Sequence, residues 1–247
     1  MGAKVIAVVN QKGGVGKTTI TCNLAYAAGS RGKTLVIDMD TQGNASQILT
    51  GDISINTRAG GAETLFYGQQ KTTESLITDV DVMHGHVYLE RIDKDETILA
   101  KAAKMRDAIR SMPYNYIIID TPPSIGSRQL APLFWADLIL IPVEPTQLSS
   151  SGLVSIMAMI NKVSSINPGV GVHLVINRFR KASSKQKEML AQLNKKLGKK
   201  ILAELSLRSP VADALDEGKS VWAYAKKDRE LSEAWRAMAN TALDLIA

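Results

Sequence analysis

Short apolar runs alternate with amphipathic segments along the chain, and this alternation predicts a layered α/β fold. The runs are rich in valine, isoleucine and leucine at successive positions, as in strands that are buried on both faces of a sheet. Five runs are predicted to be strands: residues 4–9, 34–40, 114–120, 136–143 and 171–177. Such strands, separated by helices, indicate a mostly parallel, twisted sheet with helices on both faces.

Helical periodicity marks three segments outside these runs: residues 18–32, 95–112 and 229–246. The second helix has Asp95 as a candidate cap, and Pro113 lies just beyond its end. The third helix carries its large apolar residues on one stripe, which we expect to pack on the core. That stripe comprises Leu231, Trp235, Met238, Ala242 and Leu245.

The region between residues 44 and 86 is polar and only weakly periodic, so its short helices and surface excursion are expected but not placed. No repeat, low-complexity tract or linker divides the 247 residues, and a single domain spanning 1–247 is predicted. Apolar residues make up 45% of the chain and charged residues 22%, which is typical of a folded rather than a disordered protein.

The composition excludes several classes of protein. No apolar run approaches the roughly 18 residues of a membrane-spanning helix, and the first residues lack the cleavage site of a signal peptide. Cys22 is the single cysteine, which excludes an internal disulfide and a multi-thiolate metal site, and it is predicted to be a core residue. We therefore expect a cytoplasmic protein. His84, His86 and His173 have no further candidate ligand nearby and are predicted to be structural.

Positive charge is concentrated in one stretch. The chain has 30 basic and 24 acidic residues, a net charge of +6. Residues 178–200 alone carry nine basic residues and one acidic residue, so the rest of the chain is slightly acidic. Such clustering is typical of a face that binds a polyanion, although a solvated helix that keeps the protein soluble would produce the same pattern.

A glycine-rich loop, KGGVGKTT, joins the first predicted strand to the first predicted helix. The general P-loop pattern Gly-x-x-x-x-Gly-Lys-Thr fails at Gln11, where its first glycine would stand, and the loop has an additional lysine, Lys12. Its glycines allow backbone N–H groups to surround phosphate oxygens, and the following helix points its dipole at the same anion. Lys17 is placed to reach the β- and γ-phosphates, and the Thr18 hydroxyl to bind Mg²⁺. The predicted nucleotide contacts in the loop are Gly13, Gly14, Val15, Gly16, Lys17, Thr18 and Thr19.

Three aspartates end two of the predicted buried strands. Asp38 and Asp40 close the strand 34–40, and Asp120 closes the strand 114–120. Because the carboxyl ends of parallel strands line the ligand crevice of such a sheet, we expect these carboxylates beside the glycine-rich loop. Asp120 has the position of the second acidic element of a P-loop NTPase, which holds Mg²⁺ through water. The sequence therefore predicts a magnesium-dependent nucleotide site.

Together, the segments KGGVGKTT, DMDTQGNAS and IIIDTPPS resemble the ParA family of deviant Walker-A ATPases, which also contains MinD. PVEPTQLSSSGL (142–153) and DALDEGKSV (213–221) extend the resemblance to nearly the whole chain. The resemblance implies a P-loop NTPase domain that uses ATP and Mg²⁺ and forms a homodimer when ATP binds. No Asn-Lys-x-Asp guanine motif occurs in the chain.

The resemblance also implies roles for individual residues. Lys12 matches the family's extra lysine, which reaches the partner's nucleotide and can stabilise transition-state charge as an arginine finger does; a solvated loop lysine is the alternative. Asp40 matches the carboxylate that positions or activates the attacking water, and Asp38 supports the metal shell. Asn177 resembles the residue that contacts adenine, with the Ser209–Pro210 turn nearby. The expected site therefore has three groups of residues besides the loop amides. Lys12, Lys17 and Asp40 are catalytic, Thr18, Asp38 and Asp120 bind the metal, and Asn177 and Pro210 contact the adenine base.

Two segments depart from the family pattern. Thr41 replaces the proline that is common after the second aspartate, and residues 206–214 lack the usual Pro-Arg arrangement. No DNA-contacting arginine is therefore carried over to the second segment. The chain starts directly at its first predicted strand, so we expect no N-terminal helix-turn-helix domain.

The basic stretch is the predicted DNA-binding surface. If residues 181–197 are helical, the leucines at 190, 193 and 197 share a buried stripe, and lysines lie on another face. Spaced lysines with few aromatic neighbours suit phosphate contacts that do not read sequence. The predicted DNA contacts are Lys181, Lys185, Lys196, Lys199 and Lys200. A membrane-binding terminal helix would need flanking basic residues, but no lysine or arginine follows Arg236.

The predicted function is a ParA-type partition or positioning ATPase. Its ATP-bound dimer would bind non-specific DNA on the nucleoid, without a membrane. A ParB-like or other cargo-adaptor protein would stimulate slow hydrolysis and release it. The alternatives are a MinD-like membrane-associated positioning ATPase and a regulatory nucleotide switch that has no role on DNA. No motif identifies the cargo as a plasmid, a chromosome or a protein organelle.

Overall fold

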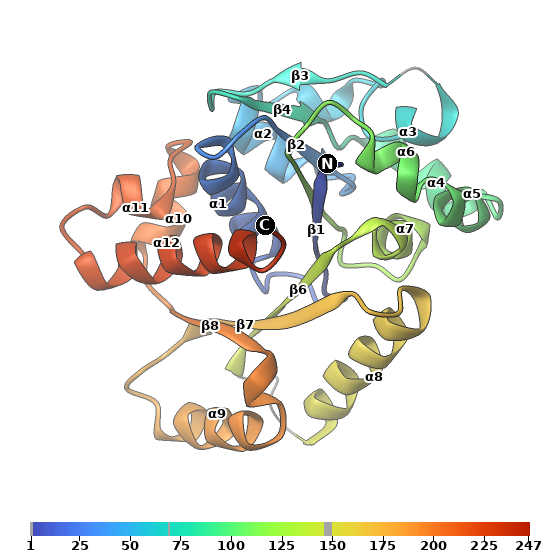
Figure 1. Cartoon of the computed structure of the whole chain (residues 1–247). Helices are drawn as coiled ribbons and strands as arrows, with labels where there is room; N and C mark the ends of the chain where they lie inside the picture. Colours follow the sequence, from blue (N-terminus) through green and yellow to red (C-terminus); the bar gives the residue numbers. More distant parts are fainter. Residues whose placement is uncertain (1, 69, 146–149) are drawn as a thin grey trace.

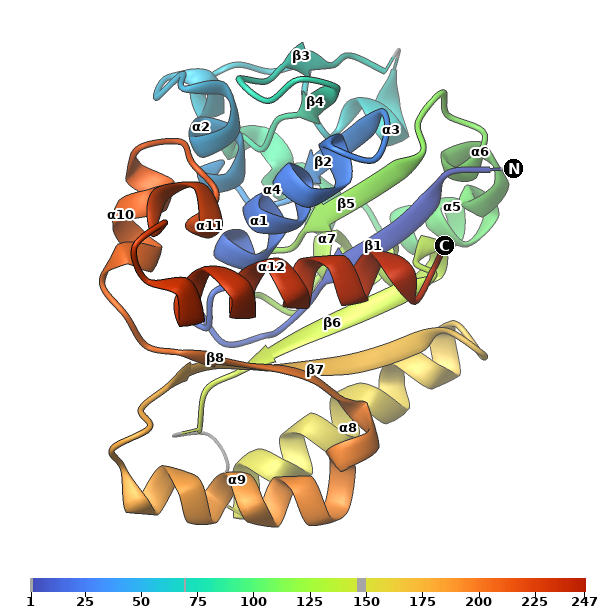
Figure 2. The same ribbon diagram turned by 60° about the vertical axis from the view of Figure 1, so that its left-hand side comes forward.

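Eight strands form one twisted sheet between two layers of helices in the computed structural model, which describes residues 2–68, 70–145 and 150–247 (Figures 1 and 2). The strands are β1 (Lys4–Val8), β2 (Thr34–Asp38), β3 (Thr73–Glu74), β4 (Val80–Met83), β5 (Tyr116–Asp120), β6 (Leu138–Val143), β7 (Gly171–Phe179) and β8 (Ile201–Ser206). Their order is β3-β4-β2-β5-β1-β6-β7-β8, and every neighbouring pair except β3–β4 is parallel. The predicted fold class is confirmed.

Helices cover both faces of the sheet. The α-helices are α1 (Lys17–Gly29), α2 (Asn44–Thr50), α3 (Thr64–Tyr67), α4 (Glu90–Lys94), α5 (Ile98–Lys104), α6 (Arg106–Arg110), α7 (Ser127–Trp135), α8 (Ser150–Ile166), α9 (Ser184–Leu197), α10 (Pro210–Asp216), α11 (Val221–Tyr224) and α12 (Arg229–Asp244). Short 3₁₀ turns are η1 (Ile55–Thr57), η2 (Val87–Leu89) and η4 (Gly198–Lys200). Helices α3 to α9 pack on one face of the sheet, and α1, α2 and α10 to α12 pack on the other.

Successive side chains of a strand point to opposite faces of the sheet, so both faces can present apolar side chains to the helices that cover them. In β1, Val5 and Ala7 face the α3–α9 layer, whereas Ile6 and Val8 face the layer that contains α1 and α12. All four side chains are fully buried, as expected for the central region of a parallel sheet that is covered on both sides. The sheet thus brings the carboxyl ends of β1, β2 and β5 to one edge, where the functional candidates lie.

The structure corrects several boundaries. The single helix predicted over 95–112 is wrong: α5 and α6 meet at Met105 and each packs separately against α7. Asp95 accepts a bond from the Thr97 amide one turn ahead of α5, and the helix itself starts after Thr97. The apolar pattern does not predict strand β8, because its sequence ILAELS carries a glutamate among apolar residues and Leu205 alone of its six residues is buried. Residues 146–149, inside the family-like segment 142–153, lie outside the described residues.

The last helix is confirmed, with one residue misplaced. Leu231, Trp235, Met238 and Ala242 of α12 are buried in the core on the face of the sheet that α1 also covers. Leu245 is 49% exposed, because α12 ends at Asp244 and the following turn buries Ile246 instead. No helix in the described parts of the chain is both long enough and apolar enough to span a bilayer.

Candidate nucleotide-binding site

The glycine-rich loop curls between the end of β1 and the start of α1. Gly14 and Gly16 have φ angles of 75° and 95°, in the left-handed region that glycine adopts without strain. A Cβ on Gly16 would lie 2.2 Å from Nδ2 of Asn177, so no larger residue fits there. The first amides of α1 point toward the loop, and Gly16 supplies no side chain to cap them, as an anion site requires.

The two lysines of the loop are oriented differently. Lys17 is buried, and its Nζ donates a 3.1 Å hydrogen bond to the carbonyl of Lys12. Burial lowers the pKa of Lys17, while the charges of Asp120 and Asp40 act in the opposite direction. Lys12 is exposed, and no ion pair of its ammonium is recorded within residues 2–68, 70–145 and 150–247. Lys17 therefore serves its own loop, whereas Lys12 is available to another molecule.

Three oxygen-bearing side chains meet at the ends of β2 and β5. Asp38 and Asp120 are directly paired in the sheet register and are fully buried. The Thr18 hydroxyl donates a 2.7 Å hydrogen bond to Oδ2 of Asp120. Burial and the charge of Asp38 raise the pKa of Asp120 to about 8, and burial raises the pKa of Asp38 to about 6. Two buried carboxylates with a hydroxyl beside them are a donor set that suits a divalent cation such as Mg²⁺, whose charge would offset their repulsion.

Asp40 lies two residues beyond the end of β2 and is half-buried. Its amide donates to Oδ1 of Asp38 at 3.0 Å, and its own Oδ1 accepts from the Gln42 amide at 3.0 Å. The structure therefore brings Asp40 close to Asp38, in a turn that leaves one carboxylate oxygen without a backbone donor among the described residues. Such a carboxylate is suited to orient a water molecule.

Asn177 reaches the same loop from β7. Its side chain is 4% exposed, and Nδ2 donates a 2.9 Å hydrogen bond to the carbonyl of Val15. Thr19 lies in the first turn of α1, directly after the loop. Pro210 is the first residue of α10, and no hydrogen bond recorded for the described residues joins it to the loop. The structure thus brings Asn177 to the phosphate loop, whereas the contact of Pro210 with the base stays a prediction.

Sequence reasoning missed three residues that support these groups. Thr21 donates a second hydroxyl bond to Asp120, at 3.3 Å. Ser46 donates to Asp38 through both its amide and its hydroxyl. The buried Arg128 pairs with Asp93 at 2.8 Å, and its guanidinium also reaches the Met39 carbonyl at 3.5 Å. Ser46 belongs to the segment DMDTQGNAS and so carries a local signal, whereas Arg128 depends on a partner 35 residues away.

The predicted basic surface lies on and around α9. The helix begins at Ser184, so Lys181 lies in the turn before it, where its ammonium pairs with Glu230. Lys185 and Lys196 are exposed on the helix, and no carboxylate partner is recorded for either among the described residues. Lys199 and Lys200 follow in η4. Leu190 and Leu193 are buried as predicted, and Leu197 only partly so.

The chain resembles known proteins along most of its length. Residues 3–172 match the family model AAA_31, described as an AAA domain. The chain is 32% identical to Protein IncC of Escherichia coli over 96% of its own length and 68% of that protein. It is 28% identical to the chromosome partitioning protein ParA of Caulobacter vibrioides over 91% of its own length and 88% of the relative.

Solved structures share the fold. One is the AMPPNP-bound form of a protein described as a plasmid partition protein of Borrelia burgdorferi. It superposes with a TM-score of 0.81 and 22% identity, over 98% of this chain and 99% of that chain.

Proposed function

Since this chain belongs to the AAA_31 family and, within it, to the ParA family of P-loop ATPases, we propose that it is a ParA-type partition or positioning ATPase. The observation that carries the proposal is the convergence of Lys17, Thr18, Asp38 and Asp120 on one edge of the sheet. A cationic loop at a helix N-terminus suits a triphosphate, and the paired carboxylates suit Mg²⁺. ATP and Mg²⁺ are therefore the proposed ligands.

Each residue of the site has a proposed task. The loop amides and Lys17 hold the phosphates, and Thr18, Asp38 and Asp120 hold Mg²⁺, which when bound neutralises charge on the phosphate oxygens. Asp40 orients the attacking water. Within the described residues, few groups other than Asp40 are available for this step, so basal hydrolysis is slow until a partner protein stimulates it.

Lys12 completes the site of a second copy. Its exposed ammonium has no acid partner among the described residues, and the backbone carbonyl of Lys12 accepts the bond from Lys17. Lys12 is thus anchored through its backbone at the loop while its side chain is available to a neighbour. A cation supplied across an interface stabilises transition-state charge and ties dimer formation to the bound triphosphate.

The proposed surface for non-specific DNA is the set of lysines around α9. Lys185 and Lys196 share an exposed face of the helix, to one side of the stripe that contains the buried Leu190 and Leu193. DNA binding through phosphates alone would place the dimer on the nucleoid, and a ParB-like or other cargo adaptor would release it by stimulating hydrolysis. The name of the Caulobacter relative, chromosome partitioning protein ParA, supports partition as the process served.

The MinD-like alternative needs a free amphipathic helix for the bilayer. The apolar stripe of α12 is occupied, since Leu231, Trp235 and Met238 pack into the core beside α1. This packing favours DNA over a membrane as the proposed surface.

A dimerisation and binding experiment tests the proposal. The Asp40→Ala variant, which should bind ATP but hydrolyse it poorly, is analysed by light scattering with Mg²⁺ and ATP, with ADP, and without nucleotide. DNA binding is titrated with salt under the same three conditions, beside pelleting with anionic liposomes. We expect a dimer and DNA binding with ATP only. A monomer at high protein concentration with ATP and Mg²⁺ bound would overturn the proposed dimer, and liposome pelleting without DNA binding would favour the MinD-like alternative.

A further inference from the structure

The buried Asp38 carboxylate is held chiefly by one residue. Both the amide and the hydroxyl of Ser46 donate to its Oδ2, at 3.0 and 2.7 Å. The other oxygen, Oδ1, accepts the amide of Asp40 at 3.0 Å. Asp38 and Ser46 are both fully buried, so water does not compete for these bonds. The plane of the carboxylate is therefore fixed by two donors on one oxygen and one on the other.

Ser46 is fixed in turn by the end of β4. Its Oγ accepts a 2.9 Å hydrogen bond from the amide of Gly85. Gly85 approaches the aspartates so closely that a Cβ there would lie 2.3 Å from the Asp40 carbonyl oxygen and 2.8 Å from Cγ of Asp38. The hydroxyl of Ser46 thus accepts one hydrogen bond and donates another, and its hydrogen is directed at Asp38.

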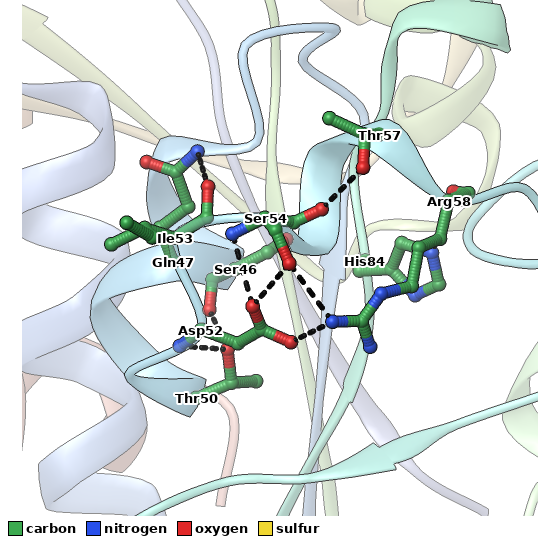
Figure 3. A network of polar contacts seen from close by, with 9 residues as sticks. All are labelled: Ser46, Gln47, Thr50, Asp52, Ile53, Ser54, Thr57, Arg58 and His84. Carbon is green, nitrogen blue, oxygen red and sulfur yellow. Dashed lines mark hydrogen bonds and ion pairs between the residues drawn. The ribbon is translucent and has the colours of Figure 1, made fainter.

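Polar contacts at the end of α2 and in the segment that follows it also support Ser46, as Figure 3 shows. Thr50 donates to the Ser46 carbonyl at 2.7 Å and accepts from the Asp52 amide at 3.2 Å. Asp52 pairs with Arg58, whose carbonyl oxygen lies 3.0 Å from Nε2 of His84. His84 immediately precedes Gly85, so the contacts close into a ring that begins and ends at Ser46.

We propose that Ser46 is a positioning residue for the magnesium site, acting through Asp38; this inference rests on the proposed function. Ser46 orients a carboxylate that would otherwise turn away from its like-charged neighbour Asp120. The ring through Thr50, Asp52 and the His84–Gly85 segment keeps Ser46 in place. Groups that orient the ligands of a metal affect its affinity by about 10- to 100-fold. Loss of the Ser46 hydroxyl therefore weakens the response to Mg²⁺ more than it weakens the phosphate loop.

Two variants test this by independent routes. Ser46→Ala removes the hydroxyl bond, and Gly85→Ala forces the β4 end away from Asp38. Ser232→Ala is the matched control, because its hydroxyl donates to a backbone carbonyl, that of Ala225, at 2.7 Å and touches no carboxylate. Binding of a fluorescent ATP analogue is measured while Mg²⁺ is titrated, and thermal melting of the nucleotide-free proteins is recorded in parallel.

We expect the Mg²⁺ concentration at half-maximal nucleotide binding to rise at least about tenfold in both variants. Binding should recover at saturating Mg²⁺, and Ser232→Ala should match the wild type. An unchanged Mg²⁺ midpoint in Ser46→Ala would overturn the inference. So would weaker nucleotide binding at every Mg²⁺ concentration together with a lower melting temperature, because that result assigns Ser46 a structural role alone. Absence of Mg²⁺-dependent nucleotide binding in the wild type would instead overturn the proposed function.

Discussion

The hydroxyl of Thr18 and the carboxylate of Asp120 form a 2.7 Å hydrogen bond across 102 positions of sequence. The bond joins the first turn of α1 to the end of β5, so the phosphate loop and the acidic edge of the sheet are one connected unit. Asp120 is also paired in register with Asp38. The site therefore holds its oxygen ligands together at the expense of repulsion between two buried carboxylates.

Replacing Asp120 by asparagine should stabilise the nucleotide-free protein and abolish its response to Mg²⁺ and ATP. Asparagine keeps an oxygen that can accept from Thr18 but removes a carboxyl group whose ionisation is opposed by burial and by the charge of Asp38. A gain of about 1 kcal/mol would raise the melting temperature by about 2–4 °C in a domain of this size. Melting curves with and without Mg²⁺ and ATP check both effects. A variant that melts below the wild type would show that the carboxylate contributes more to stability than its repulsion costs.

The same pair predicts a pH dependence. The pKa of Asp120 is raised from an ordinary 3.8 to about 8 by burial and by Asp38. A carboxyl whose folded pKa is raised contributes stability that is present below its unfolded pKa and is lost as pH rises through the folded value. The nucleotide-free wild type should therefore lose stability relative to Asp120→Asn between about pH 4 and pH 8. Urea unfolding across this range measures the difference, and parallel curves for the two proteins would contradict it.

Lys12→Ala should separate binding from turnover. Lys17 remains in place for the phosphates, so the variant should still bind ATP. Partner- or DNA-stimulated hydrolysis should fall by about 10³-fold, the scale of an arginine finger, and the ATP-dependent dimer should be lost. Phosphate release and light scattering check these effects. Wild-type turnover in Lys12→Ala would exclude a role across the dimer.

The lysines of the basic surface should contribute unequally to DNA binding. Lys185→Glu combined with Lys196→Glu should remove most binding and leave ATP binding intact, since both ammonium groups are exposed and without a recorded acid partner in the described chain. Lys181→Ala should have a smaller effect, because Glu230 already pairs with its ammonium.

The slope of log affinity against log salt should fall by about 0.9 for each DNA phosphate that the variant no longer neutralises. Lys94→Glu on α4 makes half the charge change of the double variant; it is the control and should bind DNA as the wild type does. A loss of log affinity in this control that is half the loss in the double variant would mean that net charge alone governs binding.

Acid stability should depend on a buried pair of ionisable side chains outside the nucleotide site. Glu63 and His86 are buried in direct contact. Burial would raise the pKa of Glu63, but hydrogen bonds from His86 and the Gly60 amide lower it to about 2. Because a depressed carboxyl pKa contributes stability above the ordinary value of 4.5, that stability is lost as pH falls toward 2.

Glu63→Gln should therefore be less stable than the wild type at neutral pH, and the gap should close between about pH 4.5 and pH 2. Urea unfolding at a series of pH values measures the gap. Glu90→Gln serves as the control and should follow the wild type. Glu90 is exposed, and its carboxylate lies 3.8 Å from the exposed Lys94 ammonium, a surface contact rather than a buried one. A constant gap for Glu63→Gln at all pH values would refute the role of its charge.

The local sequence pattern is sufficient to predict much of the candidate site. The loop glycines, Lys17 and Thr18 lie within eight consecutive residues between a strand and a helix, so their spacing determines their chemistry. The aspartates follow from strand ends, because parallel strands end at the same edge. The pattern does not place the elements of region 44–86, because these short elements are stabilised by contacts such as the Asp52–Arg58 pair rather than by apolar periodicity.

The sequence by itself determined the α/β fold, the phosphate loop and the identity of the acidic residues, since each depends on neighbours a few positions apart. Only the tertiary structure decided which groups touch: that Asn177 reaches Val15, that Lys181 is already paired with Glu230, and that Ser46 and Gly85 meet at Asp38. These contacts join segments that are adjacent only after the sheet has formed. Their strength depends on burial, which a linear pattern of residues does not contain.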